Sequence, residues 1–428
     1  MKTCTTCNRL YPDDGGFCPI DGQKLQPVKD VPIPSDPKDK RVGATFCSGR
    51  YQIRRIVADG GMGRVSQALD LQANRSVAMK ILHQDVATDP VARERFIREA
   101  ELSASLPHLH IVEVLSFDKT EDDSYALVME YLEGEELRMA LKREKTLPPE
   151  RVIRMLSQIG VGLGPAHERK IVHRDLKPDN VFLCGTSDGD VVKILDFGSV
   201  RDNSEGAKKL TVMGTTIGSP FYMAPEQAQG LASLDHRADV WSLAAIGYEC
   251  LTGTVPFQGS TGPAILLAIL TKDPAPPTET AKAKGKTLPK QLDEVMEEAL
   301  TKDPAIRIPT AAALADRIGH AFGLTGSHTD WARMPQSELG ARIQAAPKPT
   351  QPSAPKVDTS AMDIAMGRQE PSYDAFKAGS AGGPTPGNPF SEDEIVMGLP
   401  PSRPWWVIPA IASACVVVGA IVTFLIAR

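Results

Sequence analysis

The segment HRDLKPDN, residues 173–180, places two acids, three basic side chains and an amide within eight residues, directly ahead of the apolar run Val181-Phe182-Leu183. Asp196-Phe197-Gly198 follows sixteen residues after Asn180, behind the strand-like stretch VVKIL. Two carboxylates and an amide on such loops suit hard divalent cations, which prefer oxygen ligands. The spacing therefore predicts a metal-assisted site built on these two loops.

A glycine-rich segment lies upstream, between the strand-like runs RYQIRRI and VSQAL. Its sequence from Val57 to Val65 is VADGGMGRV, and glycines at such a turn let backbone N–H groups approach phosphate oxygens. Lys80 follows in VAMK, flanked by apolar residues, and needs an anionic partner such as Glu99 on the helical stretch RERFIREAELSASL. The alternatives are a hairpin that only turns the chain, a lysine at a sheet edge and a glutamate on a solvated helix face.

The order VAMK, HRDLKPDN, DFG and APE resembles the signature set of the protein kinases. The wording GGMGRV, HERKIVHRDLKPDN and YMAPEQ is most similar to the bacterial eukaryotic-like (Hanks-type) serine/threonine kinases. The resemblance covers residues 50–324. It implies an α+β, bilobal protein-kinase fold with a small β-rich N-lobe and a larger helical C-lobe.

The resemblance further implies a kinase that uses ATP with Mg²⁺ (or Mn²⁺) to phosphorylate Ser and Thr side chains of proteins. Asp175 would orient the acceptor hydroxyl and take its proton, and Lys177 would reach the γ-phosphate. Lys80 would hold the α- and β-phosphates and pair with Glu99. The metal ligands would be Asn180 and Asp196. The remaining nucleotide contacts would come from Val57, Ala58, Gly60, Gly61, Gly63, Val65, Ala78, Glu130, Leu132 and Phe182, with Met129 as the gatekeeper.

One residue departs from the family pattern, because Ala58 stands where the first loop glycine is usual. A Cβ there costs energy if the backbone needs a positive φ. We therefore expect an altered nucleotide affinity with activity retained.

Regulation is expected to involve Arg174, since a guanidinium beside the catalytic acid can grip a phosphate in bidentate fashion. Autophosphorylation between Asp196 and Glu226, in trans within a homodimer, would supply that phosphate. Glu226 and Arg307 resemble the ion pair that holds this loop to the helical lobe, and Asp239 resembles the residue that braces the catalytic loop. The candidate phosphorylation sites are Thr211, Thr215 and Thr216.

Composition indicates the class of protein and the nature of the segments outside residues 50–324. The 428 residues are 42% hydrophobic and 24% charged, with a net charge of −5, which excludes a wholly disordered chain and gives no sign of a nucleic-acid partner. Residues 28–49 are predicted to be a linker, and residues 325–403, rich in Pro, Ala, Gly and Ser, a disordered tether. Residues 404–428 contain a charge-free stretch about 34 Å long as a helix, at ~1.5 Å per residue, which predicts a transmembrane helix. The expected location is the cell (inner) membrane, with a single C-terminal anchor and a cytoplasmic kinase domain.

The first 27 residues carry a cysteine cluster. Cys4 and Cys7 form one CxxC knuckle, and Cys18 is followed by Asp21 where a second knuckle would have its other cysteine. This spacing is typical of a zinc ribbon, with Asp21 as a carboxylate fourth ligand for one structural Zn²⁺. The alternatives are completion of the site by Cys47, or a metal-free remnant with free thiols.

Two rival functions remain open at this point. The first is a pseudokinase that binds nucleotide and acts as a scaffold, which the presence of Lys80, Asp175, Asn180 and Asp196 disfavours. The second is a small-molecule phosphotransferase. The peptide-receiving segment Gly218-Ser219-Pro220 disfavours that reading.

Overall fold

The computed structural model describes residues 1–7, 9–28, 40–197, 220–231 and 234–346. Within the first two of these ranges the chain forms a small antiparallel sheet of β1 (Lys2–Thr3), β2 (Leu10–Tyr11) and β3 (Gln26–Pro27), in the order β2-β1-β3. Cys4, Cys18 and Leu25 are buried together beside it. We call residues 1–28 the N-terminal module.

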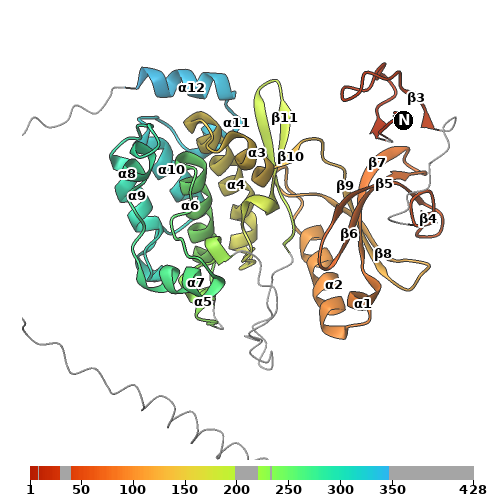
Figure 1. Ribbon diagram of the computed structural model, residues 1–428, viewed down its shortest axis with the longest axis horizontal. Coiled ribbons are helices and arrows are strands. Elements are labelled where there is room, and N and C mark those ends of the chain that lie inside the picture. Colours follow the sequence, from red (N-terminus) through yellow and green to blue (C-terminus); the bar gives the residue numbers. More distant parts are fainter. Residues whose placement is uncertain (8, 29–39, 198–219, 232–233, 347–428) are drawn as a thin grey trace, which may run out of the picture. The chain divides into compact units, whose positions relative to one another are not determined.

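A six-stranded antiparallel sheet forms the N-lobe of the described chain, in the order β4-β5-β6-β7-β9-β8 (Figure 1). Alternate side chains of its strands point into one core, as period-two patterning requires, and Tyr51, Ile53, Val77 and Met79 are at most 1% exposed. The strands are β4 (Thr45–Phe46), β5 (Tyr51–Asp59), β6 (Gly63–Asp70), β7 (Arg75–Leu82), β8 (Val114–Lys119) and β9 (Tyr125–Glu130).

Two helices, α1 (Gln84–Ala87) and α2 (Pro90–Ala104), follow β7 (Figure 1). Asp89 caps α2 by accepting a hydrogen bond from the Val91 backbone N–H at 3.0 Å, and Pro90 occupies the first helical position, where no N–H donor is needed. The helix buries Phe96 in a cluster with residues of β7 and β9. This packing fixes the helix that carries Glu99.

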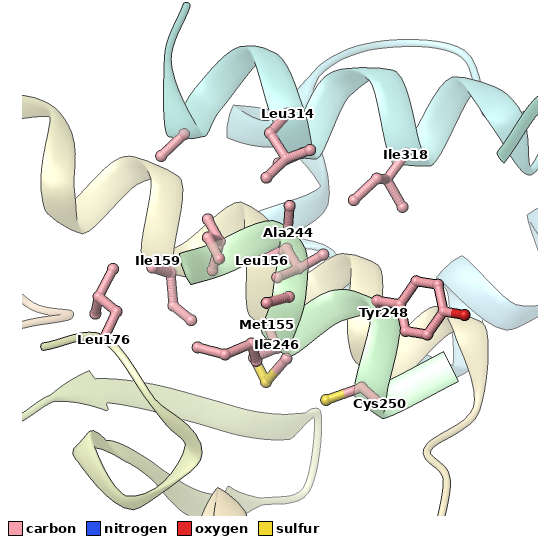
Figure 2. Packing of buried hydrophobic residues seen from close by; sticks show 14 of the residues in the cluster. Met155, Leu156, Ile159, Leu176, Ala244, Ile246, Tyr248, Cys250, Leu314 and Ile318 are labelled. Carbon is pink, nitrogen blue, oxygen red and sulfur yellow. The ribbon is translucent and has the colours of Figure 1, made fainter. Parts of the chain in front are cut away.

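The C-lobe is built around α4 (Pro149–Glu168), which is apolar on most of its surface and therefore sits inside the domain. Figure 2 shows Leu156 and Ile159 of α4 packed with Ala244 of α6 (Arg237–Thr252) and Leu314 of α10 (Ala311–Ala321). The other helical elements are α3 (Leu137–Glu144), η2 (Pro178–Asn180), η3 (Pro220–Tyr222), α5 (Pro225–Ala228), α7 (Gly262–Thr271), α8 (Pro277–Lys282), α9 (Gln291–Ala299), η4 (Pro304–Ile306), α11 (His328–Arg333) and α12 (Gln336–Ala345).

A second sheet carries the two loops of the predicted site. It consists of β10 (Glu135–Glu136), β11 (Val181–Thr186) and β12 (Gly189–Ile194), in that order. The Val112 backbone N–H donates to the Ile194 carbonyl at 3.0 Å, and the Ile194 N–H donates to the His110 carbonyl at 2.8 Å. The segment before β8 is thus fastened to β12, so the N-lobe sheet is tied to the strand that leads to Asp196.

Regular secondary structure continues past both predicted boundaries of the kinase domain, 50 and 324. Residues 45–46 of the predicted linker 28–49 form β4, because Phe46 can bury its ring with Tyr51 and Ile53. Residues 328–345 of the predicted tether 325–403 form α11 and α12, because Trp331 and Leu339 reach the core and are 0% exposed. The domain therefore extends from about residue 45 to about residue 346.

Some predictions fall outside the described residues. These are the phosphorylation sites Thr211, Thr215 and Thr216, the rest of the tether and the transmembrane helix at 404–428. Among the helices that the structure does describe, none combines the length and apolar character needed to cross a membrane.

Candidate active site

Lys80 of β7 joins the N-lobe sheet to two acidic residues, one of them predicted. Its Nζ lies 3.0 Å from Oε1 of Glu99 on α2 and 3.2 Å from Oδ1 of Asp196, the residue that follows β12 by two positions. Phe197, next to Asp196, is fully buried, with its ring 4.9 Å from that of His173. The sequence analysis predicted the Lys80–Glu99 pair, and the structure brings Asp196 to the same ammonium.

The charges in this cluster influence one another strongly. Burial alone would lower the pKa of Lys80, but the carboxylates of Asp196 and Glu99 outweigh burial and raise it. Burial raises the pKa of Glu99, and the nearby Asp196 carboxylate adds to this rise, while the Lys80 ammonium only partly offsets it. Burial also opposes ionisation of Asp196, yet Lys80 lowers its pKa overall. Asp196 is therefore the carboxylate that stays charged, ready to face a cation.

Asp175 is held by its two neighbours on the catalytic loop. Its Oδ2 accepts hydrogen bonds from Lys177 Nζ at 2.6 Å and from Asn180 Nδ2 at 3.1 Å. The same Asn180 amide nitrogen donates to the Asp175 backbone carbonyl at 2.7 Å. Within the described chain, the hydrogen bonds of the Asp175 side chain all end on Oδ2, so Oδ1 is left to meet a substrate.

Asp239, at the start of α6, braces the loop from beneath as predicted. Its carboxylate accepts from the backbone N–H groups of His173 and Arg174 and from His167 Nε2, each at 2.8 Å. The side chain is fully buried, which opposes ionisation, but the His167 hydrogen bond and charge lower its pKa. His173 in turn lies 2.8 Å, through Nε2, from the Leu195 carbonyl. The two loops are thus joined immediately before Asp196.

The glycine-rich turn lies between β5 and β6, and its glycines are needed for different reasons. A Cβ on Gly63 would overlap the Ile81 carbonyl oxygen of β7, so only glycine fits there. A Cβ on Gly61 would meet nothing within 4 Å, and on Gly60 only a backbone oxygen at 3.5 Å. Ala58 pairs with Val65 of β6, directly after a register shift between Ile56 and Ala58, and it is not among the described residues with positive φ. The condition for backbone strain at Ala58, a positive φ, is therefore not met, and the altered nucleotide affinity stays a prediction.

The predicted adenine contacts come from both sheets, Val65 and Ala78 from the N-lobe sheet and Phe182 from the second sheet. Val65 of β6 pairs with Lys80, and Ala78 of β7 pairs with Met129 of β9. Phe182 of β11 pairs with Glu136 of β10. Of the other predicted nucleotide contacts, Val57 lies near the end of β5. Glu130 is the last residue of β9, and Leu132 follows two positions later.

The predicted ion pair beneath the activation segment is present. Arg307 donates to Oε1 of Glu226 at 2.8 Å and to Oε2 at 3.0 Å, and both side chains are at most 8% exposed. Such a buried, bidentate pair fixes two segments in register more than it adds net stability. Gln227 beside it donates to the Arg174 backbone carbonyl at 2.8 Å, so this segment is fastened to the catalytic loop.

The predicted metal ligands of the N-terminal module converge. One ligand atom from each of Cys4, Cys7, Cys18 and Asp21 lies within 4.8 Å of all the others. Cys7 and Cys18 have their sulfurs 3.8 Å apart, and Asp21 Oδ2 lies 3.2 Å from Cys4 Sγ. Cys47 instead lies at the start of the N-lobe, where its backbone N–H donates to Glu121. The described cluster therefore contains Asp21 and not Cys47.

Sequence reasoning missed a group of side chains around the glycine-rich turn. Asp59, Arg64 and His83 meet there, and the sheet register sets Asp59 directly opposite Arg64. The only signal in the sequence was a pair of opposite charges flanking the glycines. His83 carries no signal, because its approach depends on how β7 ends.

Comparison with known proteins places this geometry in context. The model of the protein kinase domain family matches residues 51–318. Serine/threonine-protein kinase pkn3 of Myxococcus xanthus is 35% identical over 278 residues, which are 64% of this chain and 50% of pkn3. Serine/threonine-protein kinase PknB of Mycobacterium tuberculosis is 37% identical over 270 residues, which are 62% of this chain and 42% of PknB.

A solved structure agrees with these matches. The crystal structure of the Mycobacterium tuberculosis PknI kinase domain superposes with a TM-score of 0.51 at 27% identity, covering 66% of this chain and 98% of that domain. The chain spans about half of the length of pkn3 and less than half of PknB.

Proposed function

Because the chain belongs to the protein kinase family, we propose that it transfers the γ-phosphoryl group of ATP to Ser and Thr hydroxyls of proteins. The observation that carries this proposal is the contact of Lys80 with both Glu99 and Asp196. This contact sets a cation from the N-lobe against an acid on the loop after β12, the arrangement that phosphoryl transfer between two lobes requires.

The catalytic loop supports a protein acceptor with an alcohol side chain. With Oδ2 of Asp175 occupied by Lys177 and Asn180, Oδ1 would accept the proton of the acceptor hydroxyl. Lys177 would neutralise charge near the γ-phosphate. Positioning and electrostatics would thus supply most of the barrier reduction.

Asn180 and Asp196 have the chemistry to hold Mg²⁺. Asn180 uses its amide nitrogen to bond Asp175, so its carbonyl oxygen can serve as a ligand, and Asp196 is the carboxylate that stays ionised. Both offer the hard oxygen atoms that this cation takes. When bound, the cation would offset the charge that develops on the transferred phosphoryl group.

The test compares the wild-type chain with Asp175→Asn, using Mg·ATP and a generic protein acceptor, with phosphosites mapped by mass spectrometry. We expect labelled Ser and Thr in the wild type and none above background in the variant, with nucleotide binding retained. A wild type that binds nucleotide and never transfers phosphate would be a pseudokinase. Equal labelling by Asp175→Asn would point to a contaminating kinase.

We propose that phosphorylation of the segment before Glu226 regulates the kinase activity. Phosphate on Thr211, Thr215 or Thr216 would pair with Arg174, added in trans by a second copy of the chain. The Gln227 side chain and the buried Glu226–Arg307 pair fix the C-terminal end of this segment next to Arg174. This fixed end supports a role for Arg174 in binding a phosphate on the same segment. Active protein with all three threonines unmodified would contradict this proposal.

The N-terminal module is proposed to bind one Zn²⁺ for a structural or docking role. Tetrahedral zinc with bonds to sulfur of about 2.3 Å needs sulfurs about 3.8 Å apart, which is the Cys7–Cys18 separation of 3.8 Å. Burial raises the pKa of Cys4 to about 11, so a nearby cation would be needed to keep this thiol deprotonated. Elemental analysis of the purified chain should find one zinc per chain, and less in Cys18→Ser; no zinc in the wild type would refute the site.

Residues 404–428 are proposed to anchor the chain in the cell membrane, with the kinase domain in the cytoplasm. The uncharged stretch from Trp405 to Ala427, with aromatic residues at its start, supports a membrane span. The full chain should sediment with membranes and resist extraction by high salt. A chain ending at residue 346 should not, and equal behaviour of the two would contradict the anchor.

A further inference from the structure

Three side chains surround the base of the glycine-rich turn and have no role in the function proposed above. Arg64 donates to Asp59 Oδ2 through Nε at 3.0 Å and through its terminal nitrogen at 2.5 Å. His83, the residue after β7, has its Nε2 3.1 Å from Oδ1 of the same carboxylate. We call Asp59, Arg64 and His83 the turn clasp.

His83 holds the turn at two further points. Its backbone N–H donates to the Met62 carbonyl at 3.1 Å, and its ring Nε2 lies 2.9 Å from the Gly60 carbonyl oxygen. A carbonyl and a carboxylate can only accept hydrogen bonds, so Nε2 must carry a proton and donate to both. The imidazole thus connects the first glycine of the turn to the acid at its base.

Little else in the described chain holds the tip of this turn. Added Cβ atoms at Gly60 and Gly61 would meet almost nothing, and the Met62 side chain is 46% exposed. One backbone bond crosses the turn, from the Gly60 N–H to the Gly63 carbonyl at 3.1 Å. Because glycines have large conformational freedom, the bonds from His83 carry much of the restraint on this segment.

The turn clasp also neutralises the negative charge of Asp59, which would otherwise repel a nucleotide. A carboxylate next to a phosphate-binding turn repels a triphosphate. The hydrogen bond from Arg64 lowers the pKa of Asp59 and keeps it ionised, while its charge is compensated by that same guanidinium. Asp59 can therefore act as an acceptor for His83 without presenting an unpaired negative charge.

We propose that His83 is a positioning residue for the nucleotide: together with Asp59 and Arg64 it holds the glycine-rich turn, before ATP arrives, in the conformation that receives the phosphates. This inference rests on the proposed kinase function. Fixing a flexible segment in its bound conformation improves affinity because less order has to be created on binding. The turn clasp therefore acts on ATP binding and not on the transfer step.

The test uses the purified full chain with His83→Leu, which removes the ring donor, and His83→Gln, which can place an amide N–H near the position of Nε2. We expect the KM for ATP to rise about 3- to 10-fold in His83→Leu, the equivalent of about one hydrogen bond. The value of kcat should stay within about twofold of wild type. His83→Gln should recover most of the affinity.

A matched control is His320→Leu. His320 also places its Nε2 2.9 Å from a backbone carbonyl, that of Gly326, but it lies on α10 in the C-lobe. This variant should leave the KM for ATP unchanged. A loss of affinity equal to that of His83→Leu would mean that the effect is one of general stability.

Two measurements that need no turnover separate this inference from the proposed function. Mg·ADP binding by calorimetry should weaken in His83→Leu, and hydrogen exchange of residues 57–65 without nucleotide should become faster, both returning toward wild type in His83→Gln. Unchanged binding and exchange in His83→Leu would overturn the role of His83 even in an active kinase. A wild type that binds Mg·ADP but transfers no phosphate would overturn the proposed function alone.

Discussion

Replacing Trp331 tests whether the segment after α10 is part of the catalytic domain. The Trp331 side chain is fully buried, its Nε1 donates to the Thr325 carbonyl at 3.2 Å, and its ring packs directly on Gly319 of α10. Trp331→Ala removes a buried aromatic ring, which typically costs about 3–5 kcal/mol of unfolding free energy. At roughly 2–4 °C per kcal/mol, the Tm should fall by roughly 6–20 °C in scanning calorimetry of the full chain.

A double-mutant cycle locates the cause of that loss. A Cβ on Gly319 would overlap the Trp331 ring, so Gly319→Ala should itself be destabilising, and less so once Trp331 is alanine. We expect a coupling of more than about 1 kcal/mol between the two sites. Leu267→Ala, at a side chain that is 60% exposed, should change stability by less than about 0.5 kcal/mol. A Tm fall of less than about 2 °C in Trp331→Ala, or strict additivity, would refute the reasoning.

Three further predictions follow from the geometry of the site. Gly63→Ala should lower the Tm and raise the KM for ATP because its Cβ would overlap a β7 carbonyl, whereas Gly61→Ala, which meets open space, should leave the Tm unchanged; equal Tm values would contradict this. The pKa of buried Asp239 is lowered in the fold, so its stabilisation is present above about pH 3.9, its unfolded value, and is lost as the pH falls through the lower folded value. The Tm gap between wild type and Asp239→Asn should therefore be large at pH 7 and shrink in acid, and a constant gap would count against it. Asp21→Cys should slow the loss of zinc to a chelator, because thiolate binds zinc more tightly than carboxylate; faster loss would argue that Asp21 is not a ligand.

The fold of the central domain could be predicted because its chemistry is concentrated in short segments. HRDLKPDN, DFG and VAMK each keep their residues a few positions apart, so the fold that joins them follows from their order. The domain ends could not be predicted in the same way. Residues 328–345 are polar on average, and only a few apolar side chains, such as Trp331 and Leu339, are buried. Their folding depends on a surface of α4 that is far away in the sequence.

In the candidate site, too, some features could be predicted from the sequence and others could not. Lys80 and Glu99 could be paired from the family pattern, and four convergent ligands could be inferred from cysteine spacing. The turn clasp could not be predicted from the sequence, because strand register and the path of the chain after β7 bring Asp59 and His83 together. The sequence also could not tell whether Ala58 needs a positive φ, and the structure shows that it does not.

The docking of the last helices has a consequence for how the enzyme is made in the cell. On α4, Arg154 Nε donates to the Met334 carbonyl at 2.8 Å, and Gln158 donates to the Ala332 carbonyl at 3.3 Å. A buried guanidinium is costly until its acceptors arrive, and these acceptors are translated some 180 residues later. A nascent chain stopped at α10 would leave Arg154 with its hydrogen bond to the Asp190 carbonyl and with water in place of the later segment. This face of α4 is therefore covered only when the chain has been translated through α12, so a late segment completes the packing of a helix made some 180 residues earlier.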